Sequence, residues 1–274
     1  MKHSAWNPTK RNRNIGTTKS GYSQNNKFVV PNRWSDYKVF WERLVSPVAC
    51  PVSIKGHKLT ILVEPPALGS LHSSTPQDII KVLDLVTQEH LEEIDVVVLR
   101  QPKRKEEILR PVWGRFVYYA DLGKYSEPGV YLETVQINTV IKWGIKLTPF
   151  YEKELRALEA DGHNIERVKR GYDIKTTPDS VRSTQLFRTL PHEIGHAVDY
   201  LESSVNPSVN ASTEAESEFI RKMFKSKPTL DKEEYANRYA KEFYERNSGV
   251  LPFERIFDKH ELKKMDLNTN WFDY

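Results

Sequence analysis

One helical turn of the sequence contains two histidines and a glutamate at a spacing that can bind and use a metal ion. His192 and His196 are four residues apart, so on an α-helix their imidazoles lie on one face and can reach the same tetrahedral Zn²⁺. Glu193 stands beside them, where its carboxylate can accept a proton from a metal-bound water. The segment HEIGH therefore predicts one zinc ion per chain, with His192 and His196 as ligands and Glu193 as the general base.

The residues around the motif can bury the opposite face of the same helix. We expect a helix over Ser183–Leu201 whose core stripe consists of Leu186, Leu190, Ile194, Ala197, Val198 and Leu201. Pro191 directly precedes the motif, and a proline inside a helix removes a backbone hydrogen bond. A start with Thr189 as the cap is therefore the alternative to a start at Ser183.

A catalytic zinc usually has three protein ligands, so a third ligand is expected farther along the chain. Asp231 and Glu234 are spaced as a capping box at the start of a helix over Lys232–Arg246. That assignment gives Glu234 to the backbone and leaves Glu233 free to bind the metal. Glu233 is therefore the predicted third ligand.

Two further polar residues are predicted to orient the ligand histidines without binding the metal themselves. Asn237 lies one turn after Glu233 on the same face and could hydrogen-bond a zinc-binding imidazole. Asp199, three residues after His196, could orient a ligand histidine in the same way; the alternative is an ordinary exposed acid. Two small residues beside the Glu233 face would let the two helices approach closely: Ala236 and Ala240.

Glu202 is the competing third ligand. Counted from His192 it stands at position eleven, where metzincins place theirs. Metzincins have a glycine at position eight that turns the chain out of the helix, whereas this chain has Asp199 there. On a continuous helix Glu202 would lie about 9 Å beyond His196 along the axis. This distance favours Glu233 over Glu202.

The segments HEIGHAVD (192–199) and EEYANRYA (233–240) together resemble the gluzincin metallopeptidases, most closely the catalytic domain of anthrax lethal factor and related toxin-like domains. The resemblance covers about residues 183–246. It implies a zincin fold, one Zn²⁺ held by His192, His196 and Glu233, and hydrolysis of a peptide or protein substrate with Glu193 as base. The family often places a Tyr or His shortly before the third ligand to stabilise the oxyanion, but residues 224–230 (FKSKPTL) contain neither.

The rest of the chain predicts an α+β fold, in which a small twisted sheet and its helices precede a helical C-terminal lobe. Apolar runs predict strands over Lys58–Val63, Asp95–Leu99, Arg115–Ala120 and Val130–Val135. Apolar spacing and caps predict helices over Trp34–Leu44, from Pro76 (with Thr75 as N-cap) to about Glu93, and over Thr148–Ala160, Glu214–Lys225, Lys232–Arg246 and Pro252–Lys264. Gly162–Asp179 is expected to be an irregular charged connector.

Zincins bind an extended peptide along an edge strand above the cleft, where the substrate adds to the sheet. Val130–Val135 is the last predicted strand before the HExxH helix and mixes polar with apolar residues. It is our candidate for that edge strand, and an ordinary strand of the sheet is the alternative.

Charge is distributed unevenly. The chain has a net charge of +4, yet residues 1–35 hold seven Lys or Arg and no Asp or Glu, which leaves −3 for the remainder. We expect a disordered basic leader over 1–30 and a single domain over 31–274, with a strand-containing half (31–180) and a helical half (181–274). The leader could touch nucleic acid, but no known reader motif accompanies it, so a nucleic-acid partner is not expected.

Composition narrows the remaining classes. The only cysteine, Cys50, excludes an internal disulfide and a cysteine-based zinc site. No apolar run is long enough for a membrane helix, and the first residues lack an apolar signal segment. We therefore expect a cytoplasmic protein. Delivery of the protein as an effector is compatible with these observations. The leading hypothesis is a zinc-dependent endopeptidase. The alternative is a zincin-fold protein that binds a partner or performs another hydrolysis without proteolysis.

Overall fold

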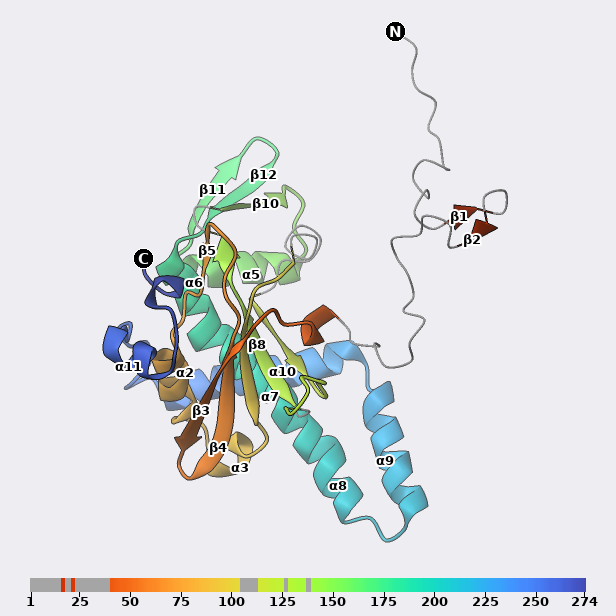
Figure 1. Ribbon diagram of the computed structural model, residues 1–274. Coiled ribbons are helices and arrows are strands. Elements are labelled where there is room, and N and C mark those ends of the chain that lie inside the picture. The colour runs from red at the N-terminus through yellow and green to blue at the C-terminus, as the bar shows by residue number, and fades with distance from the viewer. Residues whose placement is uncertain (1–15, 18–20, 23–39, 104–112, 126–127, 137–138) are drawn as a thin grey trace. The chain divides into compact units, whose positions relative to one another are not determined.

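The computed structural model describes residues 16–17, 21–22, 40–103, 113–125, 128–136 and 139–274 (Figure 1). The chain divides into two units, Met1–Arg43 and Leu44–Tyr274. In the first unit, β1 (Gly16–Thr17) and β2 (Gly21–Tyr22) form a small antiparallel pair, and η1 (Phe40–Glu42) is a short 3-10 helix. Most of the predicted leader, and the helix predicted over Trp34–Leu44 apart from its last residues, lie outside the described residues.

The second unit is built on a mixed five-stranded sheet with the order β3-β4-β6-β8-β7. β4, β6 and β8 run parallel, while β3 and β7 pair antiparallel to their neighbours at the two ends of the order. The strands are β3 (Val48–Ile54), β4 (His57–Val63), β6 (Val96–Arg100), β7 (Gly114–Val117) and β8 (Gly129–Glu133). A two-residue pair, β5 (Ser70–Leu71) with β9 (Val135–Gln136), stands apart from it. All four predicted strands are therefore present, with their ends shifted by a few residues.

The prediction that Val130–Val135 forms the edge strand is wrong. β8 lies between β6 and β7, and all five of its residues are buried. Its polar residue, Glu133, faces Arg100 and Arg115 inside the protein instead of solvent. The edge strand on this side of the sheet is β7, which precedes β8 in the chain and pairs antiparallel on its outer side. Order along the chain therefore did not give order in the sheet.

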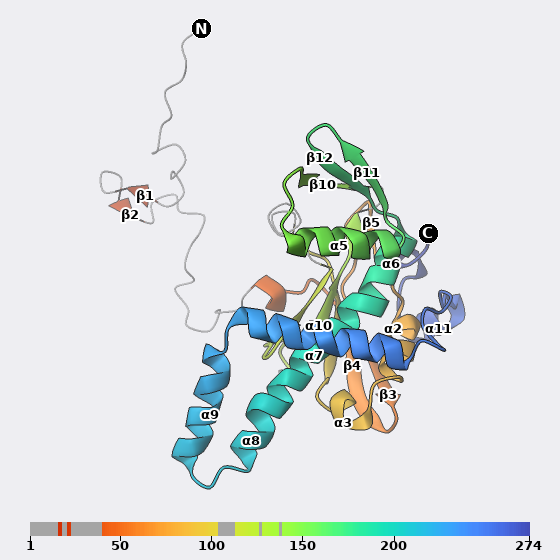
Figure 2. The same cartoon turned by 180° about the vertical axis from the view of Figure 1, so that it is seen from behind.

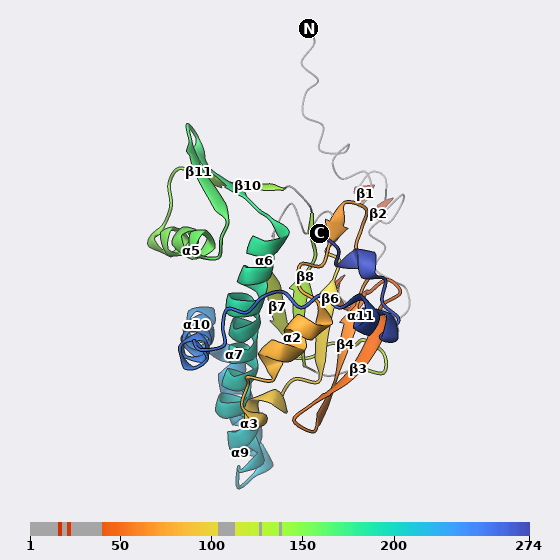
Figure 3. The same ribbon diagram turned by 90° about the vertical axis from the view of Figure 1, so that its left-hand side faces the viewer.

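Two short helices pack on the sheet where one was predicted. α2 (Pro76–Leu83) begins as expected, with Thr75 and Asp78 forming a capping box, but the helix ends at Asp84 and a second one, α3 (Gln88–Leu91), follows. The main core lies between one face of the sheet, α2 and the helix that carries the HExxH motif, as the view in Figure 3 shows. Its members include Ile61, Val63, Ile79, Val82, Val97, Leu99, Leu190 and Ile194.

A small lobe stands beyond the sheet (Figure 2). It contains α5 (Pro149–Ala160), capped by Thr148, and a three-stranded antiparallel sheet in the order β10-β12-β11. Its strands are β10 (Val140–Gly144), β11 (Asn164–Val168) and β12 (Gly171–Lys175). The expectation of an irregular connector over Gly162–Asp179 is wrong, because β11 and β12 form a hairpin there. Most side chains of this hairpin are at least partly exposed. Its strands therefore contain charged residues and lack the apolar alternation by which a strand is recognised in a sequence.

One unbroken helical segment runs from Pro178 to Val209. Two π-helical turns interrupt its α-helical hydrogen bonding. In order, its parts are α6 (Pro178–Thr184), η2 (Gln185–Thr189, π), α7 (Leu190–Tyr200), η3 (Leu201–Val205, π) and α8 (Asn206–Val209). Every residue of the predicted core stripe, from Leu186 to Leu201, is buried, which confirms the stripe.

Thr189 is not a helix cap. Its backbone is helical, with φ −69° and ψ −51°, and its side chain makes no capping hydrogen bond. The π turn removes the conflict that Pro191 was expected to cause. The amide of Leu190 bonds the Gln185 carbonyl five residues back, and Pro191, which has no amide hydrogen to donate, follows this widened turn.

Three helices follow, α9 (Glu214–Ser226), α10 (Thr229–Arg246) and α11 (Lys259–Lys264). α9 folds back along α8 as a helical hairpin (Figures 1 and 2). α10 begins at Thr229, directly after Pro228, so Asp231 lies inside the first turn and the predicted capping box with Glu234 is wrong. The proline sets the start of the helix three residues earlier than the acidic residue suggested.

The helix predicted over Pro252–Lys264 is wrong over its first half. Residues 252–258 are irregular, and two of their backbone groups bond a buried ion pair between α2 and α6 instead of a helix. The Phe253 carbonyl accepts from Arg182, and the Ile256 amide donates to Asp78. The described residues of the second unit form a mixed α+β structure, as predicted. None of their helices is long and apolar enough to cross a membrane.

Candidate metal centre

The crossing of α7 and α10 brings together the residues predicted from the sequence (Figure 2). The helices meet at Gly195, the fourth residue of HEIGH. A Cβ atom there would lie 2.9 Å from the Ala236 Cα and 3.0 Å from the Tyr239 Cβ, closer than real packing permits. Gly195 and Ala236 therefore let the helix backbones touch. The sequence analysis used Ala236 but missed Gly195, although a glycine in the middle of a helix was a usable signal.

The close crossing places Glu233 against both histidines. One carboxylate oxygen of Glu233 lies 3.3 Å from the His192 Nε2, and the other lies 3.6 Å from the His196 Nε2. Ligand atoms bound at 2.0–2.2 Å to one tetrahedral zinc are about 3.3–3.6 Å apart. Both distances between Glu233 and the histidines fall in this range, and two imidazole nitrogens with one carboxylate are a donor set that suits a catalytic zinc.

The protonation states of this group suit metal binding. Burial, together with the nearby His192, lowers the pKa of His196 to about 4, so its imidazole is neutral at pH 7. The hydrogen bond to His192 lowers the pKa of Glu233, so its carboxylate is ionised. For His192, burial is outweighed by the hydrogen bond to Glu233 and the charge of Glu193, and its pKa is raised. A metal ion binds neutral imidazoles and ionised carboxylates, so it would bind in competition with protonation of His192.

Glu193 reaches the edge strand of the sheet. Its buried carboxylate accepts a hydrogen bond from the backbone N–H of Phe116 in β7. Burial, aided by the charge of Glu233, raises the pKa of Glu193 to about 7, against the opposing effects of His192 and the Phe116 hydrogen bond. A carboxyl group with such a pKa can both accept and release a proton near neutral pH.

Two glutamates could complete a cluster with the histidines. One donor atom from each of His192, Glu193 and His196 lies within 4.8 Å of the others, so Glu193 could also approach an ion. Glu233 has the better claim to the ligand position, because its two oxygens each face one Nε2 while Glu193 is held by β7. The sequence analysis assigned the ligand position to Glu233 and the base to Glu193, and both carboxylates lie close to the histidines.

Asn237 and Asp199 have different surroundings. Asn237 lies close enough to His192 to contribute to the raised pKa of that histidine. Asp199 is fully buried, and its carboxylate binds the Lys227 Nζ at 2.6 Å and the Ser203 hydroxyl at 2.9 Å. The Nδ1 of His196 is buried with no hydrogen-bond partner in the described part of the chain. Asp199 therefore fastens the C-terminal end of α9 to α7, and it influences His196 through its charge alone.

Glu202, the competing third ligand, is directed elsewhere. It lies in η3, is exposed, and accepts a hydrogen bond of 2.6 Å from the Tyr235 hydroxyl on α10.

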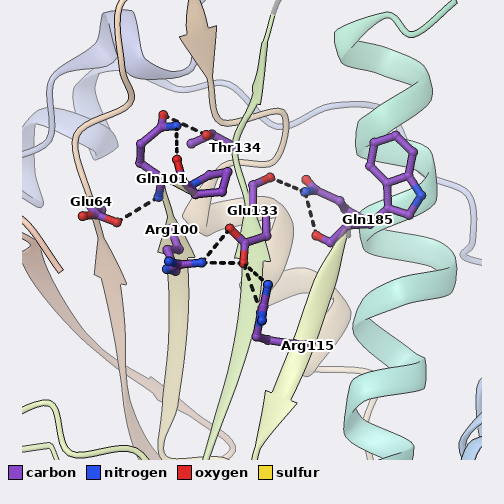
Figure 4. Close-up of polar contacts among 9 residues, drawn as sticks. Glu64, Arg100, Gln101, Arg115, Glu133, Thr134 and Gln185 are labelled. Carbon is purple, nitrogen blue, oxygen red and sulfur yellow. Dashed lines mark hydrogen bonds and ion pairs between the residues drawn. The ribbon is translucent and has the colours of Figure 1, made fainter. Parts of the chain in front are cut away.

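A second charged cluster, which the sequence analysis missed, lies at the carboxyl ends of β6 and β8 (Figure 4). The Glu133 carboxylate lies 2.9 Å from Arg100 and 3.0 Å from Arg115, and Arg100 is only 1% exposed. The Gln185 amide in η2 donates to the Glu133 carbonyl at 2.7 Å and ties the sheet to the long helix. The available signal was a charged residue at the end of each apolar run, DVVVLR and VYLE.

No protein-family model matches this chain, and no curated protein or solved structure matches it either.

Proposed function

We propose that this chain is a zinc-dependent endopeptidase with a zincin-like active site. His192, His196 and Glu233 hold one zinc ion, and Glu193 is the general base. The observation that carries the proposal is the Glu233 carboxylate, whose two oxygens face the Nε2 atoms of His192 and His196 at 3.3 and 3.6 Å. The resemblance of HEIGHAVD and EEYANRYA to the gluzincins supports the same assignment.

The residues around the site have separate tasks in peptide hydrolysis. Zinc, when bound, polarises the scissile carbonyl and lowers the pKa of its water. Glu193 would accept a proton from the attacking water and deliver it to the leaving nitrogen, for which its raised pKa is suited. Asn237 would hold the His192 ring through a hydrogen bond and thereby fix its orientation.

The position of β7 suggests how the peptide lies. β7 is an edge strand of the five-stranded sheet, and the amide of Phe116 points away from β8 toward Glu193. A substrate in extended conformation would add to this edge and carry its scissile bond past Glu193. β7 takes over the role that the sequence analysis gave to Val130–Val135.

Zinc content and peptide turnover test the proposal together. The purified protein should contain about one zinc per chain, and the double variant His192→Ala/His196→Ala should contain none. Glu193→Gln removes the base but no ligand, so it should keep zinc while turnover of a peptide library falls by about 10²–10⁴. Glu234→Gln, a change at an exposed glutamate of α10, is the control and should keep wild-type turnover.

Either of two results would contradict this proposal. Zinc retained in the double histidine variant would show that the metal binds elsewhere. A zinc-loaded wild type that cleaves no peptide would favour the alternative of a zincin-fold protein without proteolytic activity.

A further inference from the structure

Three aromatic side chains from three elements meet beside the candidate metal centre. Tyr118 follows β7, Tyr200 ends α7 one turn after His196, and Phe224 lies in α9. Their ring centroids are 5.2 to 5.8 Å apart, and Tyr118 meets each of the other two edge-on. We call these three residues the aromatic cluster. The charges of Glu193 and Glu233 are among the causes that raise the pKa of the Tyr118 phenol, so the cluster adjoins the site.

A lysine lies on this cluster, and no carboxylate of the described chain pairs with it. The Lys232 Nζ is 4.5 Å from the ring centre of Phe224 and 5.9 Å from that of Tyr118. Across the described residues Lys232 forms no ion pair, whereas the nearby Lys227 is bound to Asp199. Glu233, its neighbour in the chain, faces the two histidines. The positive charge of Lys232 is close enough to His196 to help lower the pKa of that histidine.

The location of Lys232 on its helix is unfavourable for folding. It is the fourth residue of α10, and the start of a helix carries a partial positive charge that favours acidic side chains there. A cation at this end gains nothing from the helix dipole. Its contacts with two aromatic rings hold it at the site despite this.

Tyr118 adds a second hydrogen-bond donor at the same place. Its side chain is 37% exposed, and within the described ranges its hydroxyl has no hydrogen-bond partner. The ring packs edge-on against Phe116, Tyr200 and Phe224, so its direction is fixed. An ammonium and a phenol hydroxyl, both without an acceptor among the described residues, therefore face one patch next to the residues that would do the chemistry.

We propose that Lys232 and Tyr118 form a subsite that binds a carboxylate of the substrate close to the scissile bond. The proposal rests on the peptidase function above. A carboxylate accepts hydrogen bonds from both groups and neutralises Lys232, and the aromatic cluster shields that ion pair from water. Two acids close by are already engaged, since Asp199 is bound to Lys227 and Glu233 to the histidines. The substrate is thus a peptide with an Asp or Glu side chain beside the cleaved bond, or one that presents its free C-terminal carboxylate there.

Matched peptides test this subsite. Bonds cleaved in an amidated decapeptide library identify a neutral parent peptide, from which Glu and Gln versions are made at each position flanking the bond. The wild type should cleave the best Glu peptide about fivefold faster than its Gln partner, as expected for a partly exposed ion pair. A version with a free C-terminal carboxylate directly after the flanking residue, compared with its amide, separates the second source of the carboxylate from the first.

Three variants locate the effect. Lys232→Met keeps an apolar stem on the rings but removes the charge, so it should abolish the preference for the Glu peptide over the Gln peptide while keeping zinc. Tyr118→Phe should reduce the preference. Lys241→Met removes a lysine from the same helix, where it pairs with Glu245, and should leave the preference unchanged.

The failures of the two proposals are distinguishable. Equal cleavage of charged and neutral peptides by the wild type, or a preference retained in Lys232→Met, would overturn the subsite and leave the peptidase standing. A zinc-loaded wild type that cleaves no library peptide would overturn both. Binding of the Glu peptide to the inactive Glu193→Gln variant, measured by fluorescence anisotropy, gives a second readout and should weaken about fivefold on adding Lys232→Met.

Discussion

Two charged clusters in this protein are built in opposite ways. In the sheet, the Glu133 carboxylate lies between two guanidinium groups, Arg100 and Arg115, so buried charges of opposite sign meet. At the crossing of α7 and α10, the buried Glu193 forms no ion pair with any described residue, and the His196 Nδ1 has no hydrogen-bond partner among them. A cluster that serves the fold matches its own groups, whereas one that leaves them unmatched has them available for a ligand.

The largest expected effect separates two adjacent glutamates of α10. Glu233→Ala should abolish peptide turnover and weaken zinc binding strongly, because it removes the carboxylate that faces both histidines. Glu234→Ala is the matched control. Its side chain is exposed and caps nothing, so it should change the free energy of unfolding by no more than about 0.5 kcal/mol and keep the zinc. Zinc titration and library turnover in both variants measure this difference. Equal zinc affinity in Glu233→Ala and the wild type would place the third ligand elsewhere.

The sheet cluster should behave in the reverse manner. Glu133→Gln removes the negative charge between Arg100 and Arg115 and should lower the free energy of unfolding by about 3–5 kcal/mol. Because the site residues are untouched, folded protein should still bind one zinc. Urea denaturation with and without zinc checks both points. A variant with wild-type stability would mean that the sheet does not depend on this charge.

The buried carboxylate of Glu193, which has no ion-pair partner among the described residues, should lower the free energy of unfolding when it is ionised. Burial raises the pKa of Glu193 to about 7 in the folded chain, from about 4.5 when unfolded, so the folded state binds more protons between these values. Its contribution to stability is therefore complete below about pH 4.5 and is lost as the pH rises through 7, by at most about 3 kcal/mol. Zinc-free Glu193→Gln should lack this loss and be more stable than zinc-free wild type at pH 8. Urea midpoints for both proteins at pH 5 and pH 8 measure it, and parallel pH profiles would contradict the unmatched charge.

The smallest expected effect concerns the helix crossing that forms the site. Gly195→Ala would place a methyl group 2.9 Å from the Ala236 Cα, so the helices must separate slightly. Overpacking of this kind costs about 1–3 kcal/mol, and zinc affinity should fall because Glu233 moves away from the histidines. The exposed Gly249 has nothing near its Cβ position, so Gly249→Ala serves as the control for both measurements. Unchanged zinc affinity in Gly195→Ala would show that the site tolerates a wider crossing.

The sequence revealed the parts of this structure that depend on local patterns. The HEIGH spacing, the apolar stripe from Leu186 to Leu201 and the Thr75 cap each concern residues within a few turns of one another. The neighbourhood of Glu233 also followed from the small residues beside it, although the capping box used to support it does not exist. For α10, the face that points to α7 was predicted correctly, whereas the residue at which the helix starts was not.

The errors arose where distant segments decide the outcome. Whether β7 or β8 lies at the edge of the sheet depends on how the strands are ordered in space. The residues of the two strands do not indicate this order. Residues 252–258 contain helix-compatible side chains, but their backbone bonds the Asp78–Arg182 pair from two other helices. The β11–β12 hairpin escaped notice because a small exposed sheet needs little apolar alternation. The Arg100–Glu133 pair joins residues 33 positions apart, which no local pattern connects.

A π turn lies on either side of α7, and the number of residues in the first one sets the direction in which the HEIGH side chains point. A π turn holds about one residue more than an α turn, so each extra residue rotates the later part of the helix by about 100° relative to an uninterrupted α-helix. The segment before η2 is fixed by the ion pair of Arg182 with Asp78, and HEIGH begins three residues after that turn ends. Loss of a single residue from Gln185–Thr189 would therefore swing both histidines away from α10 without altering either of them. In this helix the number of residues in η2 therefore sets the direction in which the two histidines point.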